Sequence, residues 1–312
     1  FKQKTAYEIM PSLVGSEMCI RDRIICASTG NTSASAAAYG ARYNLETIVI
    51  IPAGKIALGK LLQAMAYGAK IVSIDGNFDQ ALNAVREISD KLDLEIVNSI
   101  NPYRLEGQMT GAFEISDDLE AAPDYQFMPV GNAGNISSYF KGYKKYMDDK
   151  KISKLPRLIG VQAENSAPLV DNKIIDSPNT IASAIRIGNP ASSKLAKEAI
   201  SVTGGKFMKV SDTEIINAQS ILAKEEGLFC EPASAASLAG FLKYAEIEND
   251  FQGKKVTFIL TGNGLKDPDV AKKYLSSKII KTSSKINDIT CLLYTSDAAD
   301  DMQCVDLGGR RI

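Results

Sequence analysis

The chain has 312 residues, of which 45% are hydrophobic and 23% charged, and its formal net charge is −1. This composition is ordinary for a globular protein of up to two domains, and it argues against nucleic acid or an anionic membrane surface as the main partner. The sequence has no histidine and five cysteines without a Cys-x-x-Cys pair, which excludes His-based triads and argues against metal sites and disulfide scaffolds.

The two ends of the chain do not read as parts of a fold. Residues 1–23 show no sustained period of 2 or 3.6, and the segment from Cys291 to Ile312 looks equally foreign. Both resemble translated sequencing-adaptor read-through, so we expect non-native tails at 1–23 and 286–312; an unusual but genuine pair of tails is the alternative. No apolar run reaches the length of a membrane span and no signal peptide is apparent, so we expect a cytoplasmic protein without a membrane partner.

The first half of the chain alternates between apolar strands and amphipathic helices. Ile24 and Ile25 begin a short strand that turns through small hydroxylated residues into an alanine-rich helix. Apolar runs and helical spacing then predict strands at 47–51, 70–74 and 95–98 and helices at 58–65 and 78–92. Short connections between such elements predict a parallel sheet covered by helices on both faces.

The same alternation recurs in the second half. We expect helices at about 104–119 and 136–147 and strands at 125–130, 158–161 and 256–260. Ser211-Asp212-Thr213-Glu214 is a capping box that predicts a helix start. Ala121–Asp124 is the best candidate for a domain crossing, so we predict a smaller α/β domain at 24–123 and a larger one at 124–285.

Polar clusters follow four of the predicted strands, at Ser28–Thr32, Asn98–Arg104, Gly131–Asn135 and Thr261–Gly264. Ligands of open parallel sheets bind beyond the carboxyl ends of strands, so these clusters form the candidate site. Where a cluster lies between a strand and a helix, unpaired backbone N–H groups and the helix dipole attract an anion. Arg104 can bind a phosphate bidentately, and Thr261 can bond a ring nitrogen without adding charge. Each cluster alone is also explained as a capped turn.

Seven segments together resemble the threonine synthase family. They are Ala27-Ser-Thr-Gly-Asn-Thr-Ser-Ala-Ser35, Pro52-Ala-Gly-Lys-Ile-Ala-Leu-Gly-Lys60, Asn98-Ser-Ile-Asn-Pro-Tyr-Arg-Leu-Glu-Gly-Gln108, Gly131-Asn-Ala-Gly-Asn135, Ala184-Ile-Arg-Ile-Gly-Asn-Pro190, Cys230-Glu-Pro-Ala-Ser-Ala-Ala-Ser237 and Thr261-Gly-Asn-Gly-Leu-Lys-Asp-Pro268. The likeness extends from about Ile24 to the region of Ser276. The segments at 55–60 and 98–108 point to threonine synthase rather than to the serine/threonine dehydratases and cysteine synthases of the same fold.

This resemblance implies the cofactor pyridoxal 5'-phosphate (PLP) and PLP fold type II, an α/β fold. In that fold, two parallel-sheet domains of three αβα layers hold the cofactor site between them. The implied activity is a biosynthetic lyase that converts O-phosphohomoserine and water to threonine and phosphate, with PLP as electron sink. The partner is then a small-molecule substrate, with a homodimer as one possible assembly. A serine/threonine dehydratase and a non-catalytic binding protein of this fold are the alternatives.

The resemblance also implies roles for individual residues. The implied cofactor-binding residues are Asn31, Gly131, Asn132, Ala133, Gly134, Asn135 and Thr261. The implied substrate-binding residues are Ser28, Thr29, Thr32, Asn98 and Arg104. In these sets the glycine-rich loop would hold the cofactor phosphate, Asn31 the ring hydroxyl and Thr261 the pyridine nitrogen, while Asn98 and Arg104 would grip the substrate phosphate. No metal is expected.

The sequence departs from the family pattern in two places. Asn263 stands where the family usually has a histidine; an asparagine keeps a hydrogen bond but cannot titrate. The family's Schiff-base lysine precedes the opening motif in a Ser-Phe-Lys-Asp-Arg-Gly-like segment, and the corresponding residues Gly15–Arg23 contain no lysine. Lys2 and Lys4 lie in the segment set aside as foreign. No catalytic residue is therefore identified, and we expect an N-terminally truncated chain that is inactive as it stands.

Overall fold

The computed structural model describes residues 23–28, 30–53, 58–76, 78–98, 101–248, 251–268, 270, 284–286 and 289–290. The contacts divide the chain into two units, Phe1–Lys273 and Tyr274–Ile312, and both sheets described below lie in the first. In the second unit, the Thr290 hydroxyl donates to the carbonyl oxygen of Ile286 at 2.8 Å. Among the described residues, no helix is both long and apolar enough to cross a membrane.

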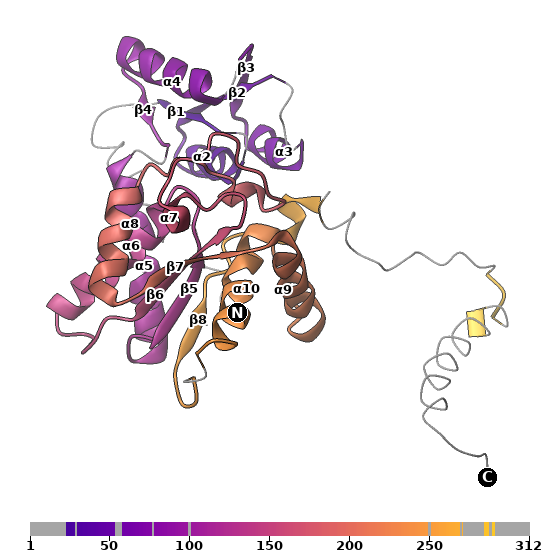
Figure 1. Cartoon of the computed structure of the whole chain (residues 1–312). Coiled ribbons are helices and arrows are strands. Elements are labelled where there is room, and N and C mark those ends of the chain that lie inside the picture. The colour runs from indigo at the N-terminus through magenta and orange to yellow at the C-terminus, as the bar shows by residue number, and fades with distance from the viewer. Residues whose placement is uncertain are drawn as a thin grey trace. The chain divides into compact units, whose positions relative to one another are not determined.

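The first sheet has four parallel strands in the order β3-β2-β1-β4 (Figure 1). The strands are β1 (Arg23–Ala27), β2 (Glu46–Pro52), β3 (Lys70–Ile74) and β4 (Glu95–Ile96), connected by the helices α2 (Asn31–Arg42), α3 (Leu58–Ala66) and α4 (Phe78–Leu92). Successive residues of β1 enter two different apolar clusters. Ile24 packs with residues of α2 and α3, whereas Ile25 packs with residues of α4. Because side chains alternate across a strand, this sheet is covered on both faces.

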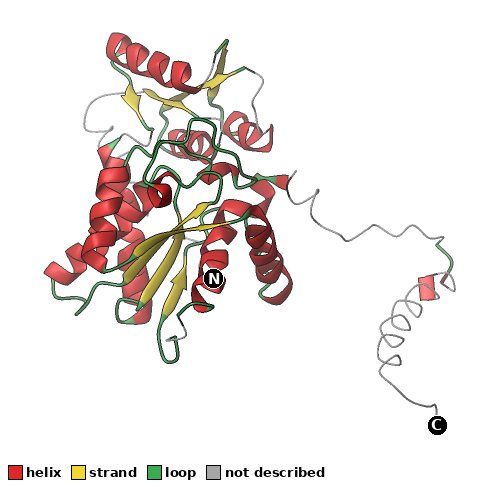
Figure 2. Ribbon diagram, in the orientation of Figure 1, coloured by secondary structure: helices red, strands yellow, loops and turns green. Residues whose placement is uncertain are grey.

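The second sheet has four parallel strands in the order β7-β6-β5-β8 (Figure 2). The strands are β5 (Tyr125–Pro129), β6 (Arg157–Ala163), β7 (Lys206–Val210) and β8 (Val256–Phe258). The helices are α5 (Pro102–Leu119), α6 (Gly134–Asp148), α7 (Pro168–Asp171), α8 (Ser193–Thr203), α9 (Asp212–Glu225) and α10 (Pro232–Ala245), with the 3₁₀ turns η2 (Ser183–Ile185) and η3 (Gly264–Lys266).

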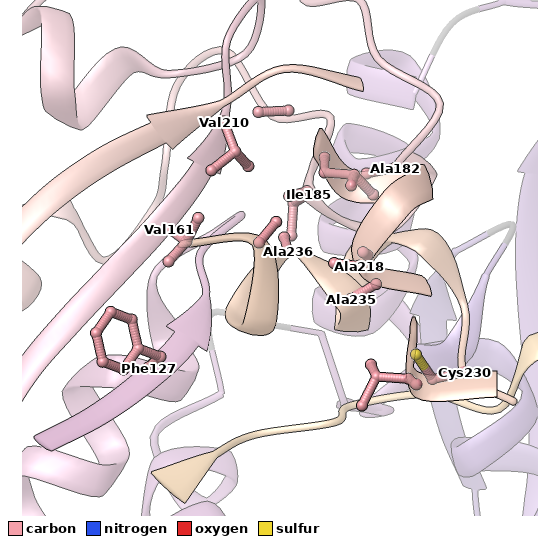
Figure 3. Packing of buried hydrophobic residues seen from close by; sticks show 14 of the residues in the cluster. Phe127, Val161, Ala182, Ile185, Val210, Ala218, Cys230, Ala235 and Ala236 are labelled. Atoms are coloured by element: carbon pink, nitrogen blue, oxygen red, sulfur yellow. The ribbon is translucent and has the colours of Figure 1, made fainter. Parts of the chain in front are cut away.

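Helices cover both faces of this sheet as well. One core cluster joins Met128 and Leu158 of the strands to α5, α6 and α8, and the other joins Phe127 and Val161 to α9 and α10. Figure 3 shows part of the second cluster, in which Ala235 and Ala236 of α10 belong to the same buried group as Ala218 of α9 and Ala182 and Ile185 at η2. Two parallel sheets with helices on both faces confirm the predicted α/β fold.

The order of elements agrees with most of the sequence predictions. The capping box is present at the start of α9, where the Ser211 hydroxyl accepts from the Glu214 N–H and the Glu214 carboxylate accepts from the Ser211 N–H. The predicted division near residue 123 stays a prediction: α5 precedes it in sequence, yet its Ala112 packs in the same cluster as Met128 of β5. β1 begins at Arg23, the last residue of the segment set aside as a tail.

Candidate active site

Each sheet reverses its direction of chain progression at one place, between β1 and β4 in the first sheet and between β5 and β8 in the second. Ligands of open α/β sheets bind at the carboxyl ends of strands beside such switch points. The predicted clusters beginning at Ser28, Asn98, Gly131 and Thr261 follow β1, β4, β5 and β8 in turn. The four clusters therefore lie at the two switch points.

The turn after β1 leads directly into α2. The Ser28 hydroxyl accepts from the Gly30 N–H at 3.1 Å, and the Ser33 hydroxyl donates to the Gly30 carbonyl oxygen at 2.7 Å. Among the described residues, no side chain caps the start of α2 at Asn31. Its first N–H groups and the positive end of its dipole thus stay available to an anionic group. Thr29 lies outside the described residues, as do residues 54–57 of the second resembling segment.

Asn98 ties the ends of β1 and β4 together. It is 7% exposed. Its Oδ1 accepts from the Ala27 N–H at 2.9 Å and its Nδ2 donates to the Ala27 carbonyl oxygen at 2.8 Å. The amide nitrogen carries two hydrogens, so contact with a substrate phosphate would use the second of them. The geometry gives Asn98 a structural contact that the sequence analysis did not anticipate.

A cavity of about 150 Å³ lies between α2 and α5, and its lining includes Asn31, Thr32 and Arg104. The Arg104 guanidinium donates from Nη1 to the Thr32 hydroxyl at 3.3 Å. Burial lowers the pKa of Arg104 and the neighbouring Cys26 thiol raises it, but a guanidinium remains charged at any ordinary pH. The cavity thus brings one predicted cofactor-binding residue together with two predicted substrate-binding residues.

Cys26, on β1 beside Arg104, is a buried thiol whose pKa lies above the ordinary value for cysteine. Burial raises its pKa to about 12 against the opposing effect of Arg104, and burial raises that of Cys230 to about 11. Both side chains are at most 4% exposed. Because the thiolate is the reactive form, neither cysteine should act as a nucleophile.

We therefore expect iodoacetamide at pH 8 to leave Cys26 and Cys230 unmodified in the folded chain and to modify both in urea, as measured by peptide mass spectrometry. The urea-treated sample is the control for reagent and peptide recovery. Modification of Cys26 at the same rate in both samples would contradict its burial beneath α2.

The glycine-rich loop after β5 has the shape of an anion cradle. Gly131 is buried, and a Cβ on it would lie 3.0 Å from the Ala184 carbonyl oxygen, so a larger residue would displace the facing segment. Ala133 has a left-handed φ of 65° at the N-cap of α6, where no side chain caps the helix. The Asn135 amide is held by the Pro129 carbonyl oxygen at 2.5 Å and by the Ile136 N–H at 2.8 Å. Because the Ile136 N–H already donates to Asn135, the N–H groups that begin α6 at Gly134 and Asn135 are the ones that fit the phosphate of PLP.

Asn31 and Thr261 are connected through the start of α10. Asn31 Nδ2 donates to Glu231 Oε1 at 3.1 Å, and the hydroxyls of Thr261 and Ser234 lie 2.9 Å apart. Asn31 Oδ1 is buried and has no hydrogen-bond partner among the residues that the structure describes. A buried acceptor of this kind is satisfied when a ligand donor approaches, which fits a bound cofactor or substrate. Glu231 and Ser234 lie in one of the segments that resemble the family, but their sequence pattern predicts no role for either residue.

Asn263, where the family usually has a histidine, caps the 3₁₀ turn η3. Its side chain accepts from the Leu265 N–H at 2.9 Å, and its backbone forms an isolated bridge with Cys230. The asparagine therefore serves the local backbone beside Thr261, a task that requires no titration.

A family model described as "Pyridoxal-phosphate dependent enzyme" matches residues 1–262. The chain is 55% identical over 268 residues to the threonine synthase of Bacillus sp. (strain ULM1), a match that covers 86% of this chain and 75% of that relative. It is 57% identical over 248 residues to the threonine synthase of Halalkalibacterium halodurans, covering 80% of this chain and 70% of the relative. The chain belongs to the threonine synthase family of pyridoxal-phosphate dependent enzymes. This confirms the resemblance and the cofactor predicted from the sequence.

Solved structures support the fold of this threonine synthase family member. A cysteine synthase from Entamoeba histolytica superposes with a TM-score of 0.72 at 20% identity, over 88% of this chain and 79% of that chain. At this identity the likeness concerns the fold alone. The superposition agrees with PLP fold type II, whose members contain two parallel sheets covered by helices. The matched family range also includes residues 1–22, which the sequence analysis set aside.

Proposed function

We propose that this chain is a lyase that converts O-phosphohomoserine and water to threonine and phosphate. The observation that carries the proposal is the cavity that Asn31, Thr32 and the partly buried Arg104 line together. A substrate with a terminal phosphate can reach Arg104 and Thr32 while its other end approaches the cofactor. Relatives more than half identical bear the name threonine synthase, which favours this activity over a serine/threonine dehydratase.

The residues divide into two sets in this proposal. The N–H groups of the loop formed by Gly131, Asn132, Ala133, Gly134 and Asn135 hold the PLP phosphate. Asn31 contacts the ring hydroxyl and Thr261 the pyridine nitrogen, and the bound PLP supplies an electron sink for breaking bonds next to the substrate amine.

The second set binds and orients the substrate. Arg104 gives the substrate phosphate a planar pair of charged donors, and Thr32 adds a hydroxyl at its side. In this proposal the second amide hydrogen of Asn98 donates to the same phosphate. The hydroxyls of Ser28 and Thr29, with the N–H groups that begin α2, bind the substrate carboxylate at the positive end of the helix dipole.

The test is to load the chain with PLP, add O-phosphohomoserine, and measure phosphate and threonine. Equal release of both supports the proposal. Ammonia from threonine, without phosphate release from O-phosphohomoserine, would make the chain a dehydratase. Binding of phosphate esters in general, without any preference for O-phosphohomoserine and without turnover, would favour a binding protein.

Borohydride reduction of the same sample tests whether any lysine of the chain carries PLP, independently of the proposed reaction. Peptide mapping locates any lysine to which PLP becomes fixed. A fixed lysine together with turnover would contradict the expected lack of a catalytic lysine. Without such a lysine, we expect the PLP-loaded chain to bind O-phosphohomoserine and not to turn it over, and failure to bind it would contradict the proposed substrate.

A further inference from the structure

The first turn of α10 carries two buried polar side chains that serve other segments of the chain. Glu231 occupies the N-cap position and is 1% exposed, and Ser234 is fully buried one turn later. An N-cap side chain ordinarily satisfies its own helix, but the Glu231 side chain makes no capping bond. Its Oε1 instead accepts from Asn31 Nδ2 at 3.1 Å, across 200 residues of sequence.

This contact determines which end of the Asn31 amide faces the site. In this contact Glu231 Oε1 is the acceptor and the Asn31 amide is the donor. Asn31 must therefore turn its NH₂ group toward Glu231 and its oxygen away from it. The oxygen that results is buried and has no partner among the described residues. Glu231 thus leaves Asn31 with an oriented acceptor and one remaining N–H for a ligand.

Ser234 makes the corresponding contacts on the other side of the turn. Its hydroxyl accepts from the Gly262 N–H at 2.7 Å and lies 2.9 Å from the Thr261 hydroxyl. The Glu231 N–H donates to the Gly262 carbonyl oxygen at 2.9 Å, so both backbone polar groups of Gly262, the residue after Thr261, are bonded to the start of α10. A Cβ on Gly262 would lie 2.3 Å from Glu231 Oε1, which shows how closely the segment fits against the carboxylate.

We propose that Glu231 and Ser234 are positioning residues for the cofactor ring, Glu231 acting through Asn31 and Ser234 through Thr261. The first turn of α10 then orients both polar partners of the ring. These partners are the Asn31 amide, which faces the ring hydroxyl, and the Thr261 hydroxyl, which faces the ring nitrogen. With the Gly262 N–H occupying an acceptor site of Ser234, the Ser234 proton has two acceptors within reach, the Thr261 hydroxyl at 2.9 Å and the Gly262 carbonyl oxygen at 3.3 Å. The carbonyl oxygen already accepts from the Glu231 N–H, so we assign the Ser234 proton to the shorter contact with Thr261. Thr261 can then direct its own proton to the ring. The inference rests on the proposed contacts of Asn31 and Thr261 with PLP.

The test measures dissociation constants of the full chain for PLP and two analogues, its 3-O-methyl ether and its 1-deaza form, by absorbance and fluorescence titration. In the unmodified chain we expect about tenfold preference for PLP over each analogue, the effect of one hydrogen bond to a buried group. Glu231→Gln should reduce the preference over the ether to threefold or less, because a glutamine allows both orientations of Asn31. Ser234→Ala should reduce the preference over the deaza form similarly.

Two kinds of controls make the outcomes distinguishable. Glu225→Gln changes charge at an exposed site, and Ser116→Ala removes a buried hydroxyl that bonds the Ala112 carbonyl oxygen on α5; both should keep all preferences. Glu231→Asp retains the charge but falls short of Asn31, so it replaces Glu231→Gln if that variant does not fold.

Asn31→Ala and Thr261→Val separate failure of the inference from failure of the proposed site. If these two variants lose the preferences while Glu231→Gln and Ser234→Ala keep them, the turn is structural and the inference is overturned. If Asn31→Ala and Thr261→Val also keep them, the proposed cofactor contacts themselves are wrong. A loss confined to each matched pair, Asn31 with Glu231 and Thr261 with Ser234, supports the inference.

Discussion

Replacing Arg104 by glutamine is expected to weaken binding of a phosphonate analogue of O-phosphohomoserine by about thirtyfold or more. Truncating one partner of a buried, charged hydrogen-bonded pair costs about 2–5 kcal/mol. Arg104 meets this description because it lines the cavity beside Thr32 and burial already lowers its pKa. The analogue carries a methylene in place of the bridging oxygen, so binding is measured by calorimetry without any turnover.

Two further measurements test whether Arg104 acts through its planar donors and whether it binds the substrate rather than the cofactor. Arg104→Lys keeps the charge but loses the planar pair of donors, so we expect a loss of about tenfold, intermediate between arginine and glutamine. PLP affinity should be unchanged in both variants, because the cofactor phosphate is proposed to lie at Gly131–Asn135. Arg86→Gln, an exposed arginine on α4, is the matched control. A parallel loss of PLP affinity would instead assign Arg104 to the cofactor.

β2 was predictable because its residues from Thr47 to Ile51 form a β-branched apolar run, as expected of a strand that is buried over most of its length. β3 also lies where it was predicted, although it is an edge strand whose residues are exposed or only partly buried. β7 was not predicted: its sequence Lys-Phe-Met-Lys-Val places lysines within an edge strand that is half-buried over most of its length. Its strand character comes from pairing with β6, a tertiary contact that no local pattern carries.

The candidate site also has one part that local sequence predicts and one part that only tertiary contacts show. Turn residues rich in Gly, Asn, Ser and Thr can be recognised locally, so the four clusters were found before their arrangement was known. Their partners could not be. Asn31 reaches Glu231 across 200 residues, and Asn98 reaches Ala27 across 71. A sequence pattern indicates that a polar side chain is present but not which group is its hydrogen-bond partner. The contacts of Glu231 and Ser234 are therefore seen only in the folded chain.

Asn98 carries the second large expected effect, on stability. Asn98→Ala removes two hydrogen bonds and leaves the Ala27 N–H and carbonyl oxygen unsatisfied at the end of β1, a strand whose last four residues are buried. Each unsatisfied group costs about 1–3 kcal/mol, so we expect the free energy of unfolding to fall by about 2–5 kcal/mol in urea titrations. Asn83→Ala, an exposed position on α4, should change it by less than about 0.5 kcal/mol.

Asn98→Asp tests the same geometry through pH. The new carboxyl keeps the bond from the Ala27 N–H but faces the Ala27 carbonyl oxygen, and burial with that repulsion raises its folded pKa above the unfolded value of about 3.9. A raised carboxyl pKa means that the folded state binds the proton more tightly. Stability relative to Asn98→Ala should therefore increase as pH falls through the folded pKa, since the protonated acid can donate to the Ala27 carbonyl oxygen. Urea titrations at pH 7 and pH 5 measure this difference. A difference that is unchanged or reversed between the two pH values would mean that the side chain does not face Ala27.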